Sequence, residues 1–287
     1  MQDGELMKIT AVVTGATSGI GKEIARGLLR QGATVIIGVR SVDKGEAVRL
    51  EFAKEPGGGK VAVLPLDVAS MKSVREFAAA VAKGHPGLQL LINNAGAMFN
   101  ERRQTAEGHE QTLATNVLGP YLLTHLLVPQ LRAGRPARIV NMVSSLAGNY
   151  DPKDLEWEQR KYDAFKVYAQ SKQVVRMMTW KMAQRLQGSG VVANAVSPGF
   201  VKTDFLQNTS GLFAGMLHLL KIFAVTPEKG AATPLWVAQA TELASVTGKY
   251  FESHKEKDGK FHEQGALNEL EKLLDQITGV SRAATTA

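Results

Sequence analysis

A glycine-rich turn between an apolar run and an amphipathic run is the feature that most constrains how this chain can fold. Residues 9–13 suit a buried strand, and Ile20, Ile24 and Leu28 then follow at helical spacing. The octapeptide TGATSGIG at 14–21 therefore joins a strand to a helix. Glycine lets backbone N–H groups approach a phosphate, and a helix N-terminus adds positive potential. The turn predicts a phosphate-binding site. A plain structural turn is the alternative, because the glycine spacing differs from the usual dinucleotide fingerprint.

Strand-like and helical runs alternate along the whole chain. Further apolar runs of strand length lie at 33–37, 61–64, 88–92, 138–143 and 191–196. Helical patterns separate them at 43–55, 71–84, 106–132 and 162–187, with an expected kink at Gly119-Pro120. Apolar strands joined by helical crossovers predict a single-domain α/β fold, a Rossmann-type doubly wound parallel sheet of about seven strands with helices on both faces.

The end of the chain is expected to extend this fold. We expect the Rossmann-type domain at residues 1–252 and an extension at 253–287. The stretch 255–262 is highly charged and predicts a solvated loop. Leu270, Leu274 and Ile277 recur at helical spacing and predict a helix over about 265–278, which packs on the core or meets a partner subunit, before a frayed end.

Composition excludes several classes of site. The 287 residues include no cysteine, which rules out disulfides, thiol nucleophiles and cysteine metal sites. The six histidines form no metal-binding motif, so we expect no metal site. The net charge of +7 includes no long basic run, so nucleic acid is not an expected partner. No apolar run could cross a bilayer and no signal peptide is recognisable, so we expect no transmembrane segment and a cytoplasmic location.

Residues at the predicted strand ends suit a dinucleotide, because ligands of doubly wound sheets bind beyond those ends. An NAD-specific site would place a carboxylate after the second strand, where this chain has Gly38. Arg40 follows, and a guanidinium can bind a 2′-phosphate through two parallel hydrogen bonds, which predicts NADP(H). The alternative for Arg40 is a solvated surface charge. Asp67 is a candidate for the adenine amino group, and Asn93 is equally suited to a structural role.

Two tyrosines in the last predicted helix have a lysine four residues later. Tyr168 and Lys172 share a helical face, and an ammonium beside a phenol would bring its pKa down from ~10 toward working pH. Tyr168 could then exchange a proton with a carbonyl or alcohol oxygen that Ser145 holds by a hydrogen bond. Tyr162 and Lys166 repeat the spacing, and an exposed surface pair is the alternative for either set. We favour Tyr168 because it lies deeper in the helix and precedes apolar residues.

Taken together, these motifs resemble the short-chain dehydrogenase/reductase family over roughly residues 8–252. They occur in the family's order: Thr14-Gly15, Gly19, Gly21, Asn93-Asn94-Ala95-Gly96, Asn116, Ser145, Tyr168, Lys172 and Pro198-Gly199. The strand end at 38–41, the insert from Asp154 to Tyr162 and the segment Gly248 to Phe251 resemble the retinol-dehydrogenase-like branch.

The resemblance implies a role for each matching residue. The catalytic set would be Asn116, Ser145, Tyr168 and Lys172, with Asn116 holding a water in a proton relay. Ser144 is the less expected serine, because the catalytic one usually comes directly before a Leu-Ala-Gly type turn. The cofactor would be bound by Gly15, Thr17, Ser18, Gly19, Ile20, Arg40, Asp67, Val68, Asn94, Ala95, Gly96, Tyr168, Lys172, Pro198, Gly199, Val201 and Thr203.

The implied function is NADP(H)-dependent hydride transfer to or from a carbonyl or alcohol. An apolar segment at about 203–226 would cover the substrate and favours a lipophilic compound or contact with a membrane surface, unless it simply packs on the core. Reduction of a carbon–carbon double bond and non-catalytic sensing of NADPH are the alternative functions. Relatives either pair through the helices near 106–132 and 162–187 or are monomers, so a homodimer is one expectation.

Overall fold

Parallel pairing of strands that are distant in the sequence organises the molecule. The computed structural model describes residues 9–201 and 225–280. Its eight-stranded sheet has the order β3-β2-β1-β4-β5-β6-β7-β8, and only β8 runs antiparallel to its neighbour. The strands are β1 (Thr10–Thr14), β2 (Thr34–Val39), β3 (Lys60–Pro65), β4 (Leu90–Asn93), β5 (Ala137–Met142), β6 (Val191–Ser197), β7 (Tyr250–Glu252) and β8 (Lys255–Lys257). This confirms the predicted doubly wound α/β fold.

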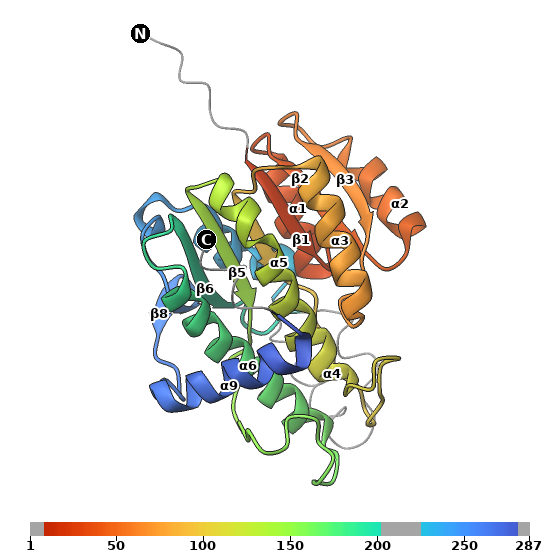
Figure 1. Ribbon diagram of the computed structural model, residues 1–287. Coiled ribbons are helices and arrows are strands. Elements are labelled where there is room, and N and C mark those ends of the chain that lie inside the picture. Colours follow the sequence, from red (N-terminus) through yellow and green to blue (C-terminus); the bar gives the residue numbers. More distant parts are fainter. Residues whose placement is uncertain (1–8, 202–224, 281–287) are drawn as a thin grey trace.

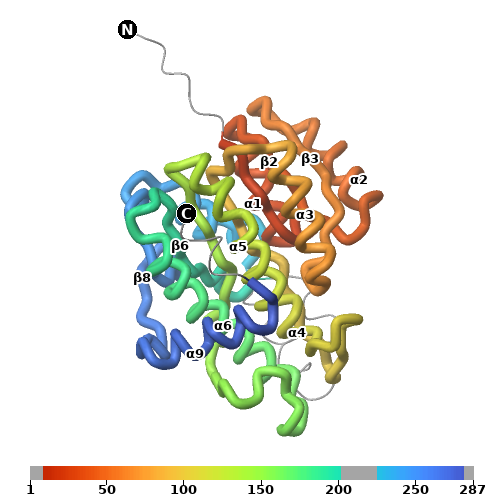
Figure 2. The backbone as a smooth tube through the Cα atoms, viewed as in Figure 1, coloured from red at the N-terminus to blue at the C-terminus, as the bar shows by residue number. Residues whose placement is uncertain are grey.

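Helices cover both faces of the sheet (Figure 1). One face carries α1 (Gly19–Leu29), α2 (Val42–Phe52) and α8 (Pro227–Gln239), the last followed by the short 3-10 helix η3 (Thr241–Leu243). The other carries α3 (Met71–Gly84), α5 (Gly119–Ala133) and α6 (Ala164–Arg185). Figure 2 shows the N-terminal β1–β3 half on one side of the molecule and the β6–β8 half on the other. Within the described ranges, no helix combines the length and apolar character that crossing a bilayer requires.

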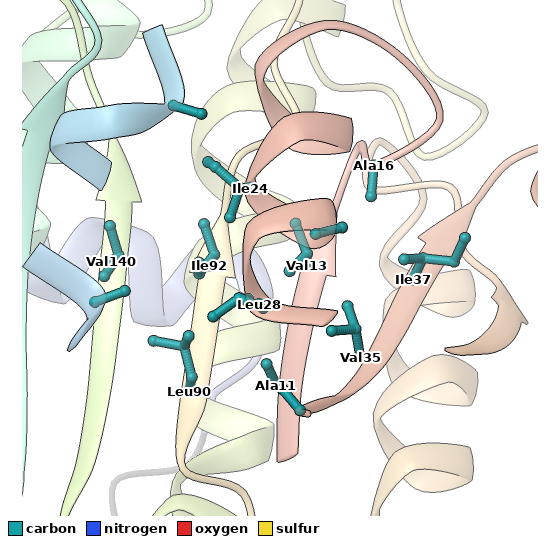
Figure 3. Close-up of a cluster of buried hydrophobic side chains, with 14 of the residues drawn as sticks. Ala11, Val13, Ala16, Ile24, Leu28, Val35, Ile37, Leu90, Ile92 and Val140 are labelled. Carbon is teal, nitrogen blue, oxygen red and sulfur yellow. The ribbon is translucent and has the colours of Figure 1, made fainter. Parts of the chain in front are cut away.

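The core under α1 explains why the glycine-rich turn has a fixed place. Ile24 and Leu28 of α1 are fully buried among Val13 of β1 and Ile92 of β4 (Figure 3). Both strands are also fully buried at these positions, as the near-continuous apolar runs of a parallel sheet require. Burial at this contact holds the N-terminus of α1 directly above the carboxyl end of β1.

The helix expected at 106–132 begins later and contains a π-helical turn. It consists of α4 (Gln111–Leu113), the π-helical segment η1 (Ala114–Leu118) and α5. Glu110 sets the start, because its carboxylate accepts hydrogen bonds from the Thr112 and Leu113 backbone N–H groups. The π turn lies directly before the predicted kink. Pro120 has no N–H, so the Asn116 carbonyl cannot accept an α-helical bond from it.

An eighth strand stands where the sequence predicted part of a charged loop. Residues 255–262 were expected to be loop, but Lys255–Lys257 form β8 against β7. Ser253 and His254 connect the two strands, both with positive φ (51° and 58°). Two such residues form a tight two-residue hairpin turn, which normally uses Asn-Gly or Asp-Gly. The sequence lacks that signal, so the hairpin could not be recognised from it.

Helix α9 (Gln264–Thr278) closes the structure over α5 and α6 (Figure 1). Its residues Leu267, Leu270 and Leu274 are buried against the helical face. Polar contacts fix it as well: the Tyr121 hydroxyl donates to Asp275 Oδ1 over 2.6 Å, and Arg185 pairs with Glu271 and Asp275. The expected frayed end at 281–287 lies outside the described residues.

Truncating Leu274 tests how much the C-terminal helix contributes to stability. Leu274 is 0 % exposed, so Leu274→Ala should lower the free energy of unfolding by ~2–4 kcal/mol through lost burial and a new cavity. Urea unfolding followed by circular dichroism measures this loss. Lys272→Ala on the exposed side of the same helix is the matched control. Equal stability of the two variants would contradict the buried position of Leu274.

Candidate functional site

A cavity of about 840 Å³ lies at the carboxyl ends of the parallel strands. Strands β2 and β4 flank β1 on opposite sides, so the crossovers that follow them leave a crevice at this edge. Most residues predicted to bind a dinucleotide line the cavity: Gly15, Thr17, Ser18, Gly19, Ile20, Arg40, Asp67, Val68, Asn94, Ala95, Gly96, Tyr168, Lys172, Pro198, Gly199 and Val201. Thr203, and nearly all of the predicted substrate-covering segment, fall outside the described residues.

The glycine-rich turn leaves room for a ligand against its backbone. Gly15 has φ +68°, and a Cβ there would lie 2.9 Å from Ala95 Cα, so only glycine suits this position. Ser18 is the N-cap of α1 but makes no side-chain capping bond. The first N–H groups of the helix are therefore available at the cavity wall, and these residues fit a dinucleotide pyrophosphate.

Asn94 fixes the turn to the neighbouring strand. Its side-chain N–H group donates to the Thr14 carbonyl over 2.9 Å, while its own backbone N–H donates to Thr14 Oγ1 over 3.1 Å. Asn93, one residue earlier, points into the protein and donates to Thr124 Oγ1 and Asn141 Oδ1. Of the two readings that the sequence allowed for Asn93, the structural one therefore applies.

Arg40 lies at the opposite end of the cavity from the predicted catalytic residues. It is exposed, and its guanidinium has no ion-pair partner in the part of the chain that the structure describes. Gly38 also lines this end. Asp67 Oδ1 accepts a hydrogen bond from the Ala69 backbone N–H over 3.0 Å, which orders the loop beside Arg40.

The other end of the cavity brings Tyr168, Lys172 and Ser144 together. Tyr168 and Lys172 lie one turn apart on α6, with the ammonium 5.8 Å from the centre of the phenol ring. Lys172 Nζ donates to the Met142 carbonyl at the end of β5 over 2.9 Å. Tyr168 is hydrogen-bonded to Ser144, two residues further along the same strand end.

Ser144, and not the predicted Ser145, is the serine that meets Tyr168. Ser144 lines the cavity, whereas Ser145 is exposed and does not. A turn causes the difference: the Ala147 N–H donates to the Ser144 carbonyl over 3.1 Å, which places Ser145 at the outer corner. The family resemblance favours the serine directly before Leu146. In this structure the chain stays extended through Val143, so Ser144 is the serine that faces Tyr168.

Burial sets the protonation of the pair. It raises the pKa of Tyr168 to about 12, and the hydrogen bond from Ser144 offsets only part of this rise. Burial also lowers the pKa of Lys172 to about 8. The sequence predicts that Lys172 lowers the pKa of Tyr168; in this structure desolvation of the phenolate raises it, and the opposing contribution is the hydrogen bond from Ser144. At neutral pH the phenol therefore holds its proton, ready to be donated.

Asn116 supports the cavity wall from behind. It is 2 % exposed and does not line the cavity. Its Oδ1 accepts from the Ala97 N–H over 2.8 Å, and its Nδ2 donates to the Ala97 carbonyl and to Ser171 Oγ, each over 2.9 Å. The side chain thus joins the end of β4 to α6, while its carbonyl lies in the π-helical turn.

Several cavity residues could not be recognised from the sequence. Beside Tyr168 the wall is mostly apolar and comes from five separate segments: Met98, Phe99, Gln111, Thr115, Leu146, Phe165 and Phe200. No motif marks them, because only the folded loops bring them together. Tyr162, the other candidate tyrosine, is outside this wall, and its hydroxyl lies 3.2 Å from the Phe99 carbonyl oxygen and 3.1 Å from Glu110 Oε1, one of which accepts its single proton. This contact helps to hold the Phe99 segment of the cavity wall in place.

Comparison with known proteins identifies the family of the chain. The sequence profile described as short chain dehydrogenase matches residues 9–211. The chain is 40% identical to retinol dehydrogenase 13 of Homo sapiens over 255 residues, covering 86% of this chain and 77% of that protein. It is 41% identical to retinol dehydrogenase 12 of Homo sapiens, covering 85% and 77%. The chain belongs to the short-chain dehydrogenase family, in its retinol-dehydrogenase-like branch.

Solved structures are also similar to the chain. An uncharacterized protein from Mycobacterium paratuberculosis matches with a TM-score of 0.76 and 30% identity, covering 95% of this chain and 94% of that one. A short-chain dehydrogenase/reductase from Serratia marcescens matches with a TM-score of 0.67 and 25% identity, covering 85% and 95%.

The protein is accordingly an oxidoreductase of the hydride-transferring kind that uses a nicotinamide cofactor. The described residues hold no cluster of three metal-binding side chains.

Replacing Lys172 should stabilise this short-chain dehydrogenase while removing its function. The lowered pKa means that the charged form is disfavoured in the folded state, at a cost of ~3 kcal/mol for a fall from 10.5 to about 8. This penalty is fully present below pH 8 and is lost as pH rises toward 10.5. Lys172→Met also loses one hydrogen bond worth ~1 kcal/mol, so the cofactor-free variant should gain ~1–2 kcal/mol at pH 7.

Urea unfolding at pH 7 and at pH 10 measures this effect. The advantage of Lys172→Met over the unsubstituted protein should shrink or reverse at the higher pH. A variant that is less stable at pH 7 would contradict the cost of burying this ammonium.

Proposed function

We propose that this protein is an NADP(H)-dependent reductase or dehydrogenase acting on a carbonyl or alcohol group of a lipophilic small molecule. The observation that carries the proposal is the meeting of Tyr168, Ser144 and Lys172 at one end of a cavity. The other end holds the glycine-rich turn and Arg40. A dinucleotide whose pyrophosphate lies on the turn would reach from Arg40 to Tyr168.

The proton chemistry follows from the protonation of Tyr168. A bound nicotinamide supplies the hydride. The phenol, protonated at neutral pH, donates its proton to the carbonyl oxygen as charge develops there, and Ser144 Oγ holds the same oxygen by a hydrogen bond. In the reverse direction the tyrosinate accepts the alcohol proton. Lys172 stabilises that anion as a nearby cation and, by the family resemblance, holds the nicotinamide ribose.

The preference for NADP(H) rests on charge at the far end of the cavity. Arg40 is the cation there, and Gly38 occupies the place where a carboxylate would bind both ribose hydroxyls. An exposed guanidinium can pair with a 2′-phosphate through two hydrogen bonds. A carboxylate on this strand end would instead repel that phosphate.

The lipophilic substrate class rests on the cavity wall beside Tyr168. The side chains that face the reacting end are largely aromatic or aliphatic: Met98, Phe99, Leu146, Phe165 and Phe200. Burying apolar surface of a ligand against such a wall is favourable by ~25 cal/mol per Å². The names of the retinol dehydrogenases that match this chain also support an apolar alcohol or aldehyde as substrate.

Replacing Tyr168 tests the proposed reaction directly. Tyr168→Phe should lower kcat with NADPH and an apolar aldehyde by ~10²–10⁴-fold, because the proton donor is lost. Cofactor affinity, measured by quenching of tryptophan fluorescence, should stay close to that of the unsubstituted protein. Full turnover by this variant would refute the role of Tyr168. Identifying the product separates carbonyl reduction from carbon–carbon double-bond reduction, and binding without turnover would favour a sensor.

The two serines give a matched pair for the same assay. Ser144→Ala should lower kcat by ~10²-fold or more, because it removes a hydrogen bond to the developing oxyanion. Ser145→Ala changes the neighbouring exposed residue and should leave turnover unchanged. Loss of turnover in Ser145→Ala but not in Ser144→Ala would support Ser145, the serine that the sequence predicts.

Arg40 tests the choice of cofactor. Arg40→Asp should weaken NADPH binding by ~10–100-fold, because a charge-assisted pair is replaced by repulsion, while NADH binding changes little. Calorimetric titration with each cofactor measures both affinities. Lys54→Asp, at the far end of α2, makes the same charge change away from the cavity and is the control. Equal losses for the two cofactors would show that Arg40 does not bind the 2′-phosphate.

A further inference from the structure

The catalytic face of α6 carries a third residue at the same spacing. Tyr168, Lys172 and Arg176 follow one another every four residues, so they share one side of the helix. Lys172 Nζ donates to the Met142 carbonyl over 2.9 Å, and Arg176 Nη2 donates to the Ser144 carbonyl over 2.7 Å. The two cations therefore hold alternate carbonyls of the chain that leaves β5.

Arg176 is buried in a way that stability alone does not explain. It is 6 % exposed, and among the described residues its Nε has no hydrogen-bond partner. No carboxylate forms an ion pair with it there; its guanidinium carbon lies 3.9 Å from the centre of the Tyr250 ring. Burial lowers the pKa of Arg176 although the charge of Glu252 opposes this, so the buried cation is costly, and an apolar side chain of similar volume would avoid that cost.

The contacts of Arg176 extend to the second loop of the cavity. The hydroxyl of Tyr250 donates to Glu252 Oε2 over 2.9 Å, and Ser197 Oγ donates to the other carboxylate oxygen over 3.4 Å. Ser197 Oγ also accepts from the Gly199 N–H over 3.3 Å, and Gly199 lines the cavity. The network thus joins the Ser144 turn to the loop after β6.

The Ser144 backbone needs such a contact, because the sheet no longer holds it. The last parallel bond beyond β5 is donated by the Val143 N–H to the Val196 carbonyl. Beyond it, Ser144 Oγ accepts from the Leu146 N–H over 3.2 Å, and the Ser144 carbonyl accepts from the Ala147 N–H, both within the turn itself. Two bonds tie this turn to α6, the helix that carries Tyr168: the Gly148 N–H donates to the Ala169 carbonyl over 3.0 Å at the end of the turn, and Arg176 is the side chain of α6 that holds the Ser144 carbonyl itself.

We propose that Arg176 is a positioning residue for catalysis, which holds Ser144 at hydrogen-bonding distance from the Tyr168 hydroxyl. This inference rests on the proposed function, since it assigns Ser144 to the substrate oxygen. Arg176 does not line the cavity, so it acts through Ser144 and touches neither substrate nor cofactor. A misplacement of a reacting group by about 1 Å can reduce a rate by ~10²-fold, so a single buried contact can matter this much.

Substitutions at Arg176 separate positioning from simple structural support. Arg176→Met should lower kcat by ~10–100-fold, with KM changed by less than about threefold and the thermal midpoint unchanged or raised. Arg176→Lys keeps the charge without the planar fork, so it should restore part of kcat. Lys181→Met on the same helix contacts Asn268 and Glu271 away from the cavity, and it should leave kcat unchanged. Unchanged kcat in Arg176→Met, or loss of kcat only in proportion to lost folded protein, would overturn the proposal.

A double-mutant cycle with Ser144→Ala tests the route of the effect. If Arg176 acts through Ser144, adding Arg176→Met to Ser144→Ala should lower kcat by less than about twofold further. A further loss equal to that of the single Arg176→Met variant would mean that Arg176 acts by another route, which would overturn the assignment.

Amide hydrogen exchange gives a readout that needs no turnover. Without the bond from Arg176 to the Ser144 carbonyl, the Leu146 and Ala147 amides in the Arg176→Met variant should exchange at least about tenfold faster, while Lys181→Met should leave them unchanged. Unchanged exchange in Arg176→Met would overturn the inference even in an active enzyme. Absence of turnover by the unsubstituted protein, with faster exchange in Arg176→Met, would instead refute the proposed function and keep the structural role of Arg176.

Discussion

Parallel pairing of β1 with both β2 and β4 is the constraint on which the rest of the structure depends. It forces each following segment to cross a face of the sheet, which places α1 and α8 on one side and α3, α5 and α6 on the other. It also gathers the carboxyl ends of the strands at a single edge. Residues as distant in the sequence as Gly15, Ser144 and Gly199 line one cavity for that reason.

The buried cations of the candidate site lower the stability of the fold at this edge of the sheet. Lys172 and Arg176 are cations buried beside the end of β5; each donates a hydrogen bond to a backbone carbonyl, and within residues 9–201 and 225–280 neither forms an ion pair with a carboxylate. A protein under selection for stability alone would fill these positions with apolar side chains. The apolar core under α1 and the contacts of α9 stabilise the fold and offset the cost of burying these two cations.

Local patterns allowed most of the fold and part of the site to be predicted. The four-residue spacing of Tyr168 and Lys172 fixes their common face within one helix, so it could be read directly from the sequence. The choice between Ser144 and Ser145 depends on where the chain stops being extended after β5, which the two adjacent serines do not reveal. The raised pKa of Tyr168 depends on side chains from other segments, and the β7–β8 hairpin uses the unusual turn Ser253-His254. These features depend on tertiary structure and could not be obtained from spacing.

Helix α9 has a consequence for how copies of the protein can meet. It covers an apolar surface of α6 that includes Val174, Met177 and Met178, and Tyr121 ties it to α5. A copy approaching these helices from outside would encounter the polar outer side of α9. Removal of α9 would expose that surface to solvent, and exposed apolar patches of this kind favour association. Helix α9 therefore keeps this apolar surface of α6 from solvent and from other copies of the chain.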